Sequence, residues 1–211
     1  MRHLLATWPL LLGMGLLMLG AGLQGTLLGL RATLENFPTP VIGVVMAAYY
    51  VGYIGGSLGA PHLMQRVGHI RVFAALTAVA SVAILVQAVL VSPIVWTALR
   101  MTSGFCFAGV YVVAESWLND RADNHNRGAL LSVYMVVLYV GLTGGQFLLN
   151  AADPAGPLLF LLTSVLISIA VVPMTSACSA LPSSARRTSS VCTTCIAFRR
   201  WAWSAWSSLA C

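Results

Sequence analysis

The sequence contains no lysine, and its 211 residues include only five aspartates and glutamates. Charged residues make up 8% of the chain and hydrophobic residues 59%, so too few polar groups are present to coat a water-soluble globule of this length. All of the positive charge comes from arginines that stand singly or near the C-terminus, which argues against a nucleic-acid surface. The composition therefore indicates that lipid is the solvent.

Motifs of metal sites are also missing. No His-Glu-x-x-His sequence is present, which argues against a zinc protease. His62, His69 and His125 have no metal-ligand spacing to one another, and Cys192-x-x-Cys195 stands in a segment without periodicity. We therefore predict no catalytic residue, no metal site and no cofactor.

Six apolar runs approach or reach the about 20 residues that a membrane-spanning helix requires. They cover residues 8–30, 41–59, 72–91, 94–117, 128–149 and 158–173. None alternates with the two-residue period of a membrane strand, so helices are predicted. The first run is longer than the about 7 to 15 apolar residues of a signal peptide, which favours a retained span over a cleaved leader. Residues 1–173 thus predict an all-α membrane protein with six transmembrane helices.

Residues 174–211 differ abruptly from these runs. Serine, threonine, cysteine and arginine dominate at first, and Trp201, Trp203 and Trp206 follow. Tryptophan has a single codon, and if serine and arginine use their four-fold-box codons, the alternative reading frame through residues 198–206 would encode small and aliphatic residues like those of a seventh membrane helix. We hypothesise a frameshifted stretch. A genuine cytoplasmic tail with interfacial aromatic residues is the alternative.

Arginines are distributed unequally between the two ends of the predicted spans. Arginine in short loops is retained on the cytoplasmic side during insertion. One side carries Arg31 alone, whereas the other carries Arg2, Arg66, Arg71, Arg121 and Arg127. Both ends of the bundle should therefore be cytoplasmic.

The polar linkers divide the spans into two units of three helices. Residues 31–40 follow the first helix of one unit and residues 119–127 that of the other, on opposite faces of the membrane. This arrangement is typical of inverted repeats, although any odd number of spans per unit would invert in the same way. We predict two inverted three-helix repeats.

Residues 61–71, expected to form a loop, resemble the loop after the second helix in the major facilitator superfamily. That loop typically reads Gly-x-Leu-Ala-Asp-Arg-x-Gly-Arg-Arg. The matching positions here are Leu63, Arg66, Gly68 and the nearby Arg71. Pro61 stands where the first glycine is usual and Gln65 where the acid is usual, so the carboxylate that would lock the family's cytoplasmic gate is missing.

Two further groups of residues carry the same resemblance. Arg100-x-x-x-Gly104-x-x-x-Ala108 is similar to the family's fourth-helix pattern. The other group resembles a branch of bacterial, largely uncharacterised members. It comprises Glu115-Ser116, Asn126-Arg127-Gly128, Tyr139-Val140-Gly141 and Gly145-Gln146. In order and placement, these motifs make residues 1–173 similar to the N-terminal six-helix half of such a transporter in a bacterial inner membrane.

This resemblance implies secondary transport of a small solute by alternating access, with the site between two six-helix halves. The implied partners are a small-molecule substrate, the lipid bilayer and a missing second half. The alternative is an intact small membrane protein that self-associates through glycine faces, without a transport cycle. Gly52, Gly55, Gly56 and Gly59 form such a face, and their spacing predicts close packing of the second helix.

Candidate residues of the substrate path are polar groups inside apolar runs. Arg100 should face a cavity because a charge in the membrane interior costs about 2.5–3.5 kcal/mol, and the alternative is a side chain that reaches the outer interface. Gln24 and Gln146 should face the bundle or a cavity. Tyr49 and Tyr53 share one helix face and could line the path or bond to another helix.

Candidate gate residues lie at the cytoplasmic end. Gln65, Arg66, Gly68 and Arg71 form the expected gate loop. Glu115 and Arg127 should form an ion pair across a short loop. A structural role for this pair is favoured over proton coupling, because a carboxylate at the interface can remain hydrated.

Overall fold

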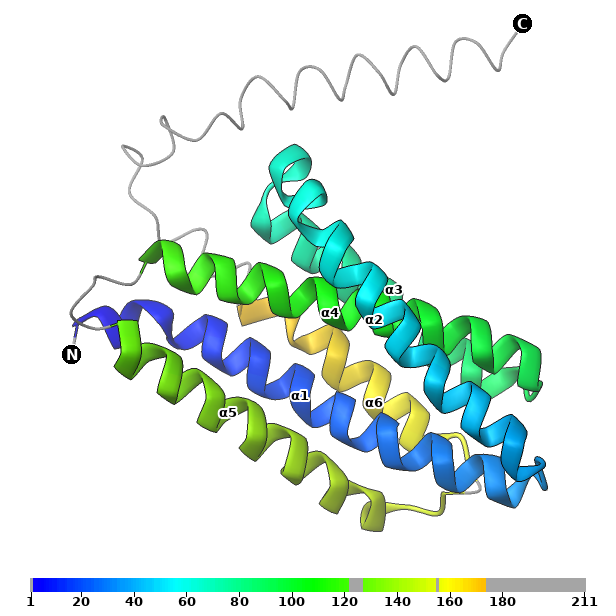
Figure 1. Cartoon of the computed structure of the whole chain (residues 1–211). Coiled ribbons are helices and arrows are strands. Elements are labelled where there is room, and N and C mark those ends of the chain that lie inside the picture. The colour runs from blue at the N-terminus through cyan, green and yellow to red at the C-terminus, as the bar shows by residue number, and fades with distance from the viewer. Residues whose placement is uncertain (1, 122–126, 155, 174–211) are drawn as a thin grey trace, which may run out of the picture.

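The computed structural model describes residues 2–121, 127–154 and 156–173, and within them it is entirely helical (Figure 1). The helices are α1 (Arg2–Leu34), α2 (Thr39–Val67), α3 (His69–Val89), α4 (Pro93–Arg121), α5 (Arg127–Phe147), the 3₁₀ helix η1 (Leu148–Ala151) and α6 (Leu158–Ile169). Helices are expected because they satisfy their own backbone hydrogen bonds in lipid. The tail at 174–211, with its frameshift hypothesis, lies outside the described residues.

Within the described residues, five helices are long and apolar enough to cross a membrane. Their spans are Trp8–Leu34, Thr39–Val67, His69–Val89, Pro93–Asn119 and Arg127–Asn150. The remaining apolar helix, Leu158–Pro173, is shorter. At about 1.5 Å per residue it measures roughly 24 Å, against about 30 Å for the hydrocarbon core. The all-α prediction is confirmed, whereas the layout of six full spans in two repeats stays a prediction.

The segment at 61–71 is not the loop that the sequence suggested. α2 continues through Pro61 to Val67, and α3 begins at His69, so Gly68 alone separates the two helices. Its φ of 90° is a conformation that favours glycine. The helix outlasts the apolar run because leucine, methionine, glutamine and arginine are all good helix formers. Hydrophobicity therefore marked the end of the span and not the end of the helix.

The helices associate in a definite set of pairs. α2 packs mainly on α4, α1 packs on α5 and α6, and α3 packs on α4 and α6. Figure 1 shows α1 and α4 side by side along the bundle, with α5 beyond α1 and α2 crossing α4. α1 and α4 thus provide the centre of the bundle, from which the candidate site is built.

Two glycines bring α2 and α4 into backbone contact. A Cβ atom on Gly52 would overlap the carbonyl group of Met101, and a Cβ atom on Gly104 would overlap that of Tyr49. Each helix therefore presents a glycine to a carbonyl of the other. The close packing predicted for the glycine face of α2 is confirmed at Gly52, and again at Gly56, which meets Phe105.

The α1–α5 interface contains the same reciprocal arrangement. A Cβ atom on Gly145 of α5 would overlap the carbonyl group of Leu19, and one on Gly22 of α1 would overlap that of Leu142. In the α2–α4 interface, Gly104 stands three residues after Met101, and Tyr49 stands three residues before Gly52. In the α1–α5 interface, Gly22 stands three residues after Leu19, and Leu142 stands three residues before Gly145. The two helix pairs therefore share one local packing geometry.

Candidate functional site

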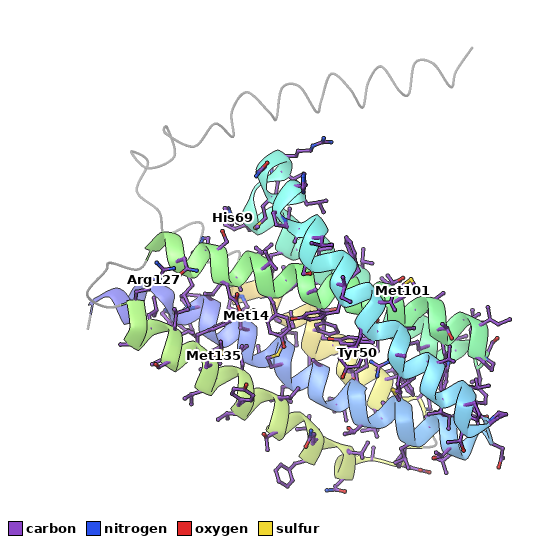
Figure 2. All side chains as sticks on the ribbon, viewed as in Figure 1. Met14, Tyr50, His69, Met101, Arg127 and Met135 are labelled. Atoms are coloured by element: carbon purple, nitrogen blue, oxygen red, sulfur yellow. The ribbon has the colours of Figure 1, made fainter. Side chains whose placement is uncertain are left out.

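A cavity of about 350 Å³ lies among α1, α2, α4 and α5. Its lining includes the aromatic or polar side chains of Gln24, Tyr49, Tyr50, Arg100, Phe107 and Tyr111. Figure 2 shows Tyr50 on the side of α2 that faces α1. Three of the five predicted path residues, Arg100, Gln24 and Tyr49, are thus brought together from three different helices.

Arg100 is the charged group of this cavity. Its side chain is only 6% exposed, so it lies within the bundle. The guanidinium carbon lies 5.3 Å from the centre of the Tyr49 ring, within the range of a cation–π interaction. Nη2 donates a hydrogen bond to the sulfur of Met46 at 3.2 Å, and the buried Nε has no partner. A thioether is a weak acceptor, so the described part of the chain gives this arginine no strong hydrogen-bond acceptor.

No carboxylate among the described residues forms an ion pair with Arg100. Glu35 is bound to Arg31 at 2.7 Å on α1. Glu115 is on α4 itself, but about four turns, or roughly 22 Å, farther along the helix. The charge of Arg100 therefore faces the cavity without a counter-charge from the described part of the chain.

Gln24 links the cavity to the interior of the bundle. It is 1% exposed, and its Nε2 donates a hydrogen bond to Oε1 of Gln87 on α3 at 3.2 Å. Gln87 is fully buried, and its own Nε2 has no partner. The pair satisfies one buried donor and one buried acceptor, and it connects α1 to a helix that does not line the cavity.

The cavity walls are aromatic. The Tyr49 ring is 5.5 Å from Tyr50 and 6.1 Å from Tyr53, and Tyr53 is in turn 6.4 Å from Tyr111. The Tyr111 hydroxyl donates a hydrogen bond to the sulfur of Met18 at 2.6 Å. Tyr53 extends this row of rings without being among the lining residues of the cavity. Such walls offer flat apolar faces to an organic solute.

Tyr50, Phe107 and Tyr111 were missed by reasoning from the sequence. A signal for two of them was present, because positions seven and eleven residues after Arg100 return to nearly the same side of a helix with about 3.6 residues per turn. Phe107 and Tyr111 occupy those positions. Tyr50 gave no such signal, because adjacent residues on a helix do not share a face.

The other predicted residues lie away from this cavity. Gln146 of α5 is exposed and is not among the lining residues. Gln65 and Arg66 are exposed on the end of α2, and Arg71 is exposed on α3. Gly68 forms the break between these helices. The gate role of these four residues stays a prediction.

Glu115 and Arg127 do not form an ion pair with each other in the described structure. Glu115 is half-buried on α4, and Arg127 is the exposed first residue of α5. Beside Glu115, the Oγ of Ser116 lies 3.1 Å from Nε2 of His69. Figure 2 shows His69 and Arg127 toward the end of the bundle at which α1 begins. The predicted gate pair remains untested as a functional element.

Two kinds of chemical site can be considered for the described residues. Gly55-x-Ser57-x-Gly59 has the form of a hydrolase nucleophile motif, but it lies inside α2 and not on the strand-to-helix turn of such enzymes. The Ser57 hydroxyl donates a hydrogen bond to the Ile54 carbonyl of its own helix at 2.8 Å. Within the described ranges, no three histidine, cysteine or acidic side chains are placed to hold a metal ion.

Comparison with known proteins agrees with this geometry. Residues 25–191 match the family model described as sugar (and other) transporter. The chain is 33% identical over 141 residues to the "Uncharacterized MFS-type transporter YcaD" of Salmonella typhimurium and to that of Salmonella typhi. Each match covers 67% of this chain and 37% of the relative, so the matched region spans little more than a third of the relatives' length. No solved structure matches significantly.

Proposed function

Because this chain belongs to the sugar (and other) transporter family of the major facilitator superfamily, we propose that it is part of a secondary transporter that moves a small solute by alternating access. The family match and the apolar helices make it a multi-pass membrane protein. The observation that carries the proposal is the cavity beside Arg100, a buried charge that a purely structural bundle would not need.

The helix packing supports an inverted-repeat architecture for this transporter. If α1 to α3 correspond to α4 to α6, then the α2–α4 pair corresponds to α5–α1, and the α3–α4 pair corresponds to α6–α1. These four pairs form most of the bundle, together with α3–α6, which corresponds to itself. The cavity is lined by the first two helices of each unit, and the two glycine interfaces correspond in the same way. A site between repeats is typical of such transporters.

We further propose that residues 1–173 form one six-helix half, with both ends cytoplasmic in a bacterial inner membrane. The relatives are much longer than the matched region, which supports a second half in the complete protein. The cavity would then open toward that half. Self-association of a small membrane protein without a transport cycle is the competing outcome of the test below.

Transport can be tested in energised inner-membrane vesicles. The gene would be sequenced beyond the codon for Cys211, and the 211 residues would be expressed with and without the coding region that follows. Mass spectrometry would compare solutes that the vesicles gain or lose from a mixture. We expect one solute class to move only with the longer protein, and Arg100→Ala to abolish the movement while insertion persists. Unchanged solute levels with the inserted longer protein would reject transport.

A further inference from the structure

The buried charge of Arg100 indicates that the described cavity lining lacks a negatively charged oxygen. Arginine keeps its proton in proteins, so the buried guanidinium is a permanent cation. Among the described residues its contacts are a sulfur atom and an aromatic ring, and Nε has no acceptor there. None of these contacts supplies an oxygen atom with negative charge. The planar guanidinium is the group that best matches an oxyanion, because it can donate two parallel hydrogen bonds.

The other residues that line the cavity indicate the chemistry of the rest of a bound molecule. Tyr49, Tyr50, Phe107 and Tyr111 line the same cavity as the guanidinium, and the Tyr49 ring lies 5.3 Å from it. Ring faces favour flat or apolar organic groups, and a volume of about 350 Å³ fits only a small molecule. An inorganic anion would satisfy Arg100 but would leave these faces without a partner.

A neutral solute fits the cavity less well. Aromatic faces can also stack against a sugar ring, and the family description includes sugars. A neutral sugar would leave Arg100 without a counter-charge while displacing water from around it. An uncompensated charge in a low-dielectric site is strongly unfavourable. An anionic solute removes this penalty and gains the aromatic contacts as well.

We propose that the cavity binds a small organic solute through an oxyanion group, such as a carboxylate, sulfonate or phosphate ester, held by Arg100 and flanked by the tyrosines. This inference rests on the proposed transport function, since it names the class of solute. Arg100 is the residue that selects for charge, and the aromatic rings select for an organic body.

The test uses the purified 211-residue chain in lipid nanodiscs and ¹⁹F NMR, which detects weak binding. The probes are 4-fluorobenzoate and 4-fluorobenzamide, which have similar shapes and differ in charge. We expect the chain to broaden the benzoate signal beyond empty nanodiscs and the amide signal to show no such effect. Unlabelled benzoate and benzenesulfonate should displace the probe, whereas equal concentrations of chloride or glucose should not.

The variants separate Arg100 from general attraction of anions by a basic protein. Arg100→Gln should weaken 4-fluorobenzoate binding at least tenfold, and Arg31→Gln, at an arginine outside both the cavity and the expected gate, should leave it unchanged. Arg100→Lys should bind more weakly than the parent but keep the preference for benzoate. Equal binding of the amide, displacement by glucose, or full binding in Arg100→Gln would overturn the proposal. Displacement of the probe by chloride at equal concentration would overturn the claim that the site selects an organic anion.

The benzoate–amide comparison and the chloride competition on the unmodified chain together decide the question even if Arg100→Gln fails to fold. Binding is measured at equilibrium and needs no transport cycle. Selective binding of benzoate without solute movement in vesicles would reject transport and keep the anion site. Movement of a neutral solute by the longer protein, without benzoate binding, would reject the anion site and keep transport.

Discussion

The guanidinium of Arg100 lies 5.3 Å from the Tyr49 ring, and the carbonyl group of Tyr49 meets Gly104, one helical turn after Arg100 on α4. The same segment of α2 therefore contributes both a backbone contact and a cation–π contact to α4. Because Gly104 has no side chain, the two backbones approach closely enough for the ring to face the charge. Helix packing and cavity chemistry are coupled at this point.

Replacement of Gly104 by alanine should separate α2 from α4 at the cavity. The added Cβ would overlap a carbonyl group, which cannot move away as a flexible side chain can. We expect a loss of about 1–3 kcal/mol in stability, as for other overpacked sites. Thermal unfolding in nanodiscs, followed by circular dichroism, measures the effect. Gly43→Ala is the control because nothing lies within 4 Å of its Cβ position, and equal melting temperatures for the two variants would contradict the packing.

The α1–α5 interface should respond in the same way at Gly145. Alanine there would overlap the Leu19 carbonyl group, whereas at the adjacent Gly144 the nearest atom is a Leu19 methyl group at 4.0 Å. We expect Gly145→Ala to lower stability by about 1–3 kcal/mol and Gly144→Ala to be nearly neutral. The same unfolding assay compares the variants. A similar loss for Gly104→Ala and Gly145→Ala would support equivalent repeats, and a neutral Gly145→Ala would count against them.

The buried glutamine pair should respond unequally to replacement of its two members. Gln24→Leu leaves both polar ends of Gln87 without a partner in the core, which costs about 1–3 kcal/mol for a buried unsatisfied group. Gln87→Leu removes a side chain that already has one unsatisfied nitrogen, and Gln24 can turn to the cavity. We therefore expect Gln24→Leu to be the more destabilising change in thermal unfolding.

The double variant Gln24→Leu/Gln87→Leu checks this explanation. It removes the unsatisfied groups together, so its stability should exceed that of Gln24→Leu alone. A double variant with the summed losses of the two single variants would show that the pair does not interact in the native bundle.

The topology should place the turn at Gly68 and the start of α5 on the cytoplasmic side. The arginine count motivates this expectation, since Arg66, Arg71 and Arg127 all flank these two places. Reporter fusions after Gly68 and Arg127 should report the cytoplasm, and fusions after Asn36 and Asp153 should report the outer face. An outward signal after Gly68 would remove the basis for a cytoplasmic gate there.

Part of the candidate site follows from the amino-acid sequence alone. Arg100, Gln24 and Tyr49 can be named because a polar or charged group inside an apolar run needs a partner or a cavity. Gln146 follows the same rule, yet it is exposed on the described surface. Polarity identifies residues that avoid lipid, but it does not say which of several aqueous or protein surroundings each one meets.

The amino-acid sequence by itself determined the solvent, the helical class and the approximate spans, because these depend on local composition and on backbone hydrogen bonding within each segment. It also showed that glycines would pack closely. Tertiary structure decided that Gly104 meets Tyr49 and Gly145 meets Leu19. It also decided that residues 61–67 stay helical and that Arg100 lies against the Tyr49 ring, with no carboxylate partner among the described residues. Those outcomes depend on which helices touch and in what register, and many pairings of six apolar helices bury similar area.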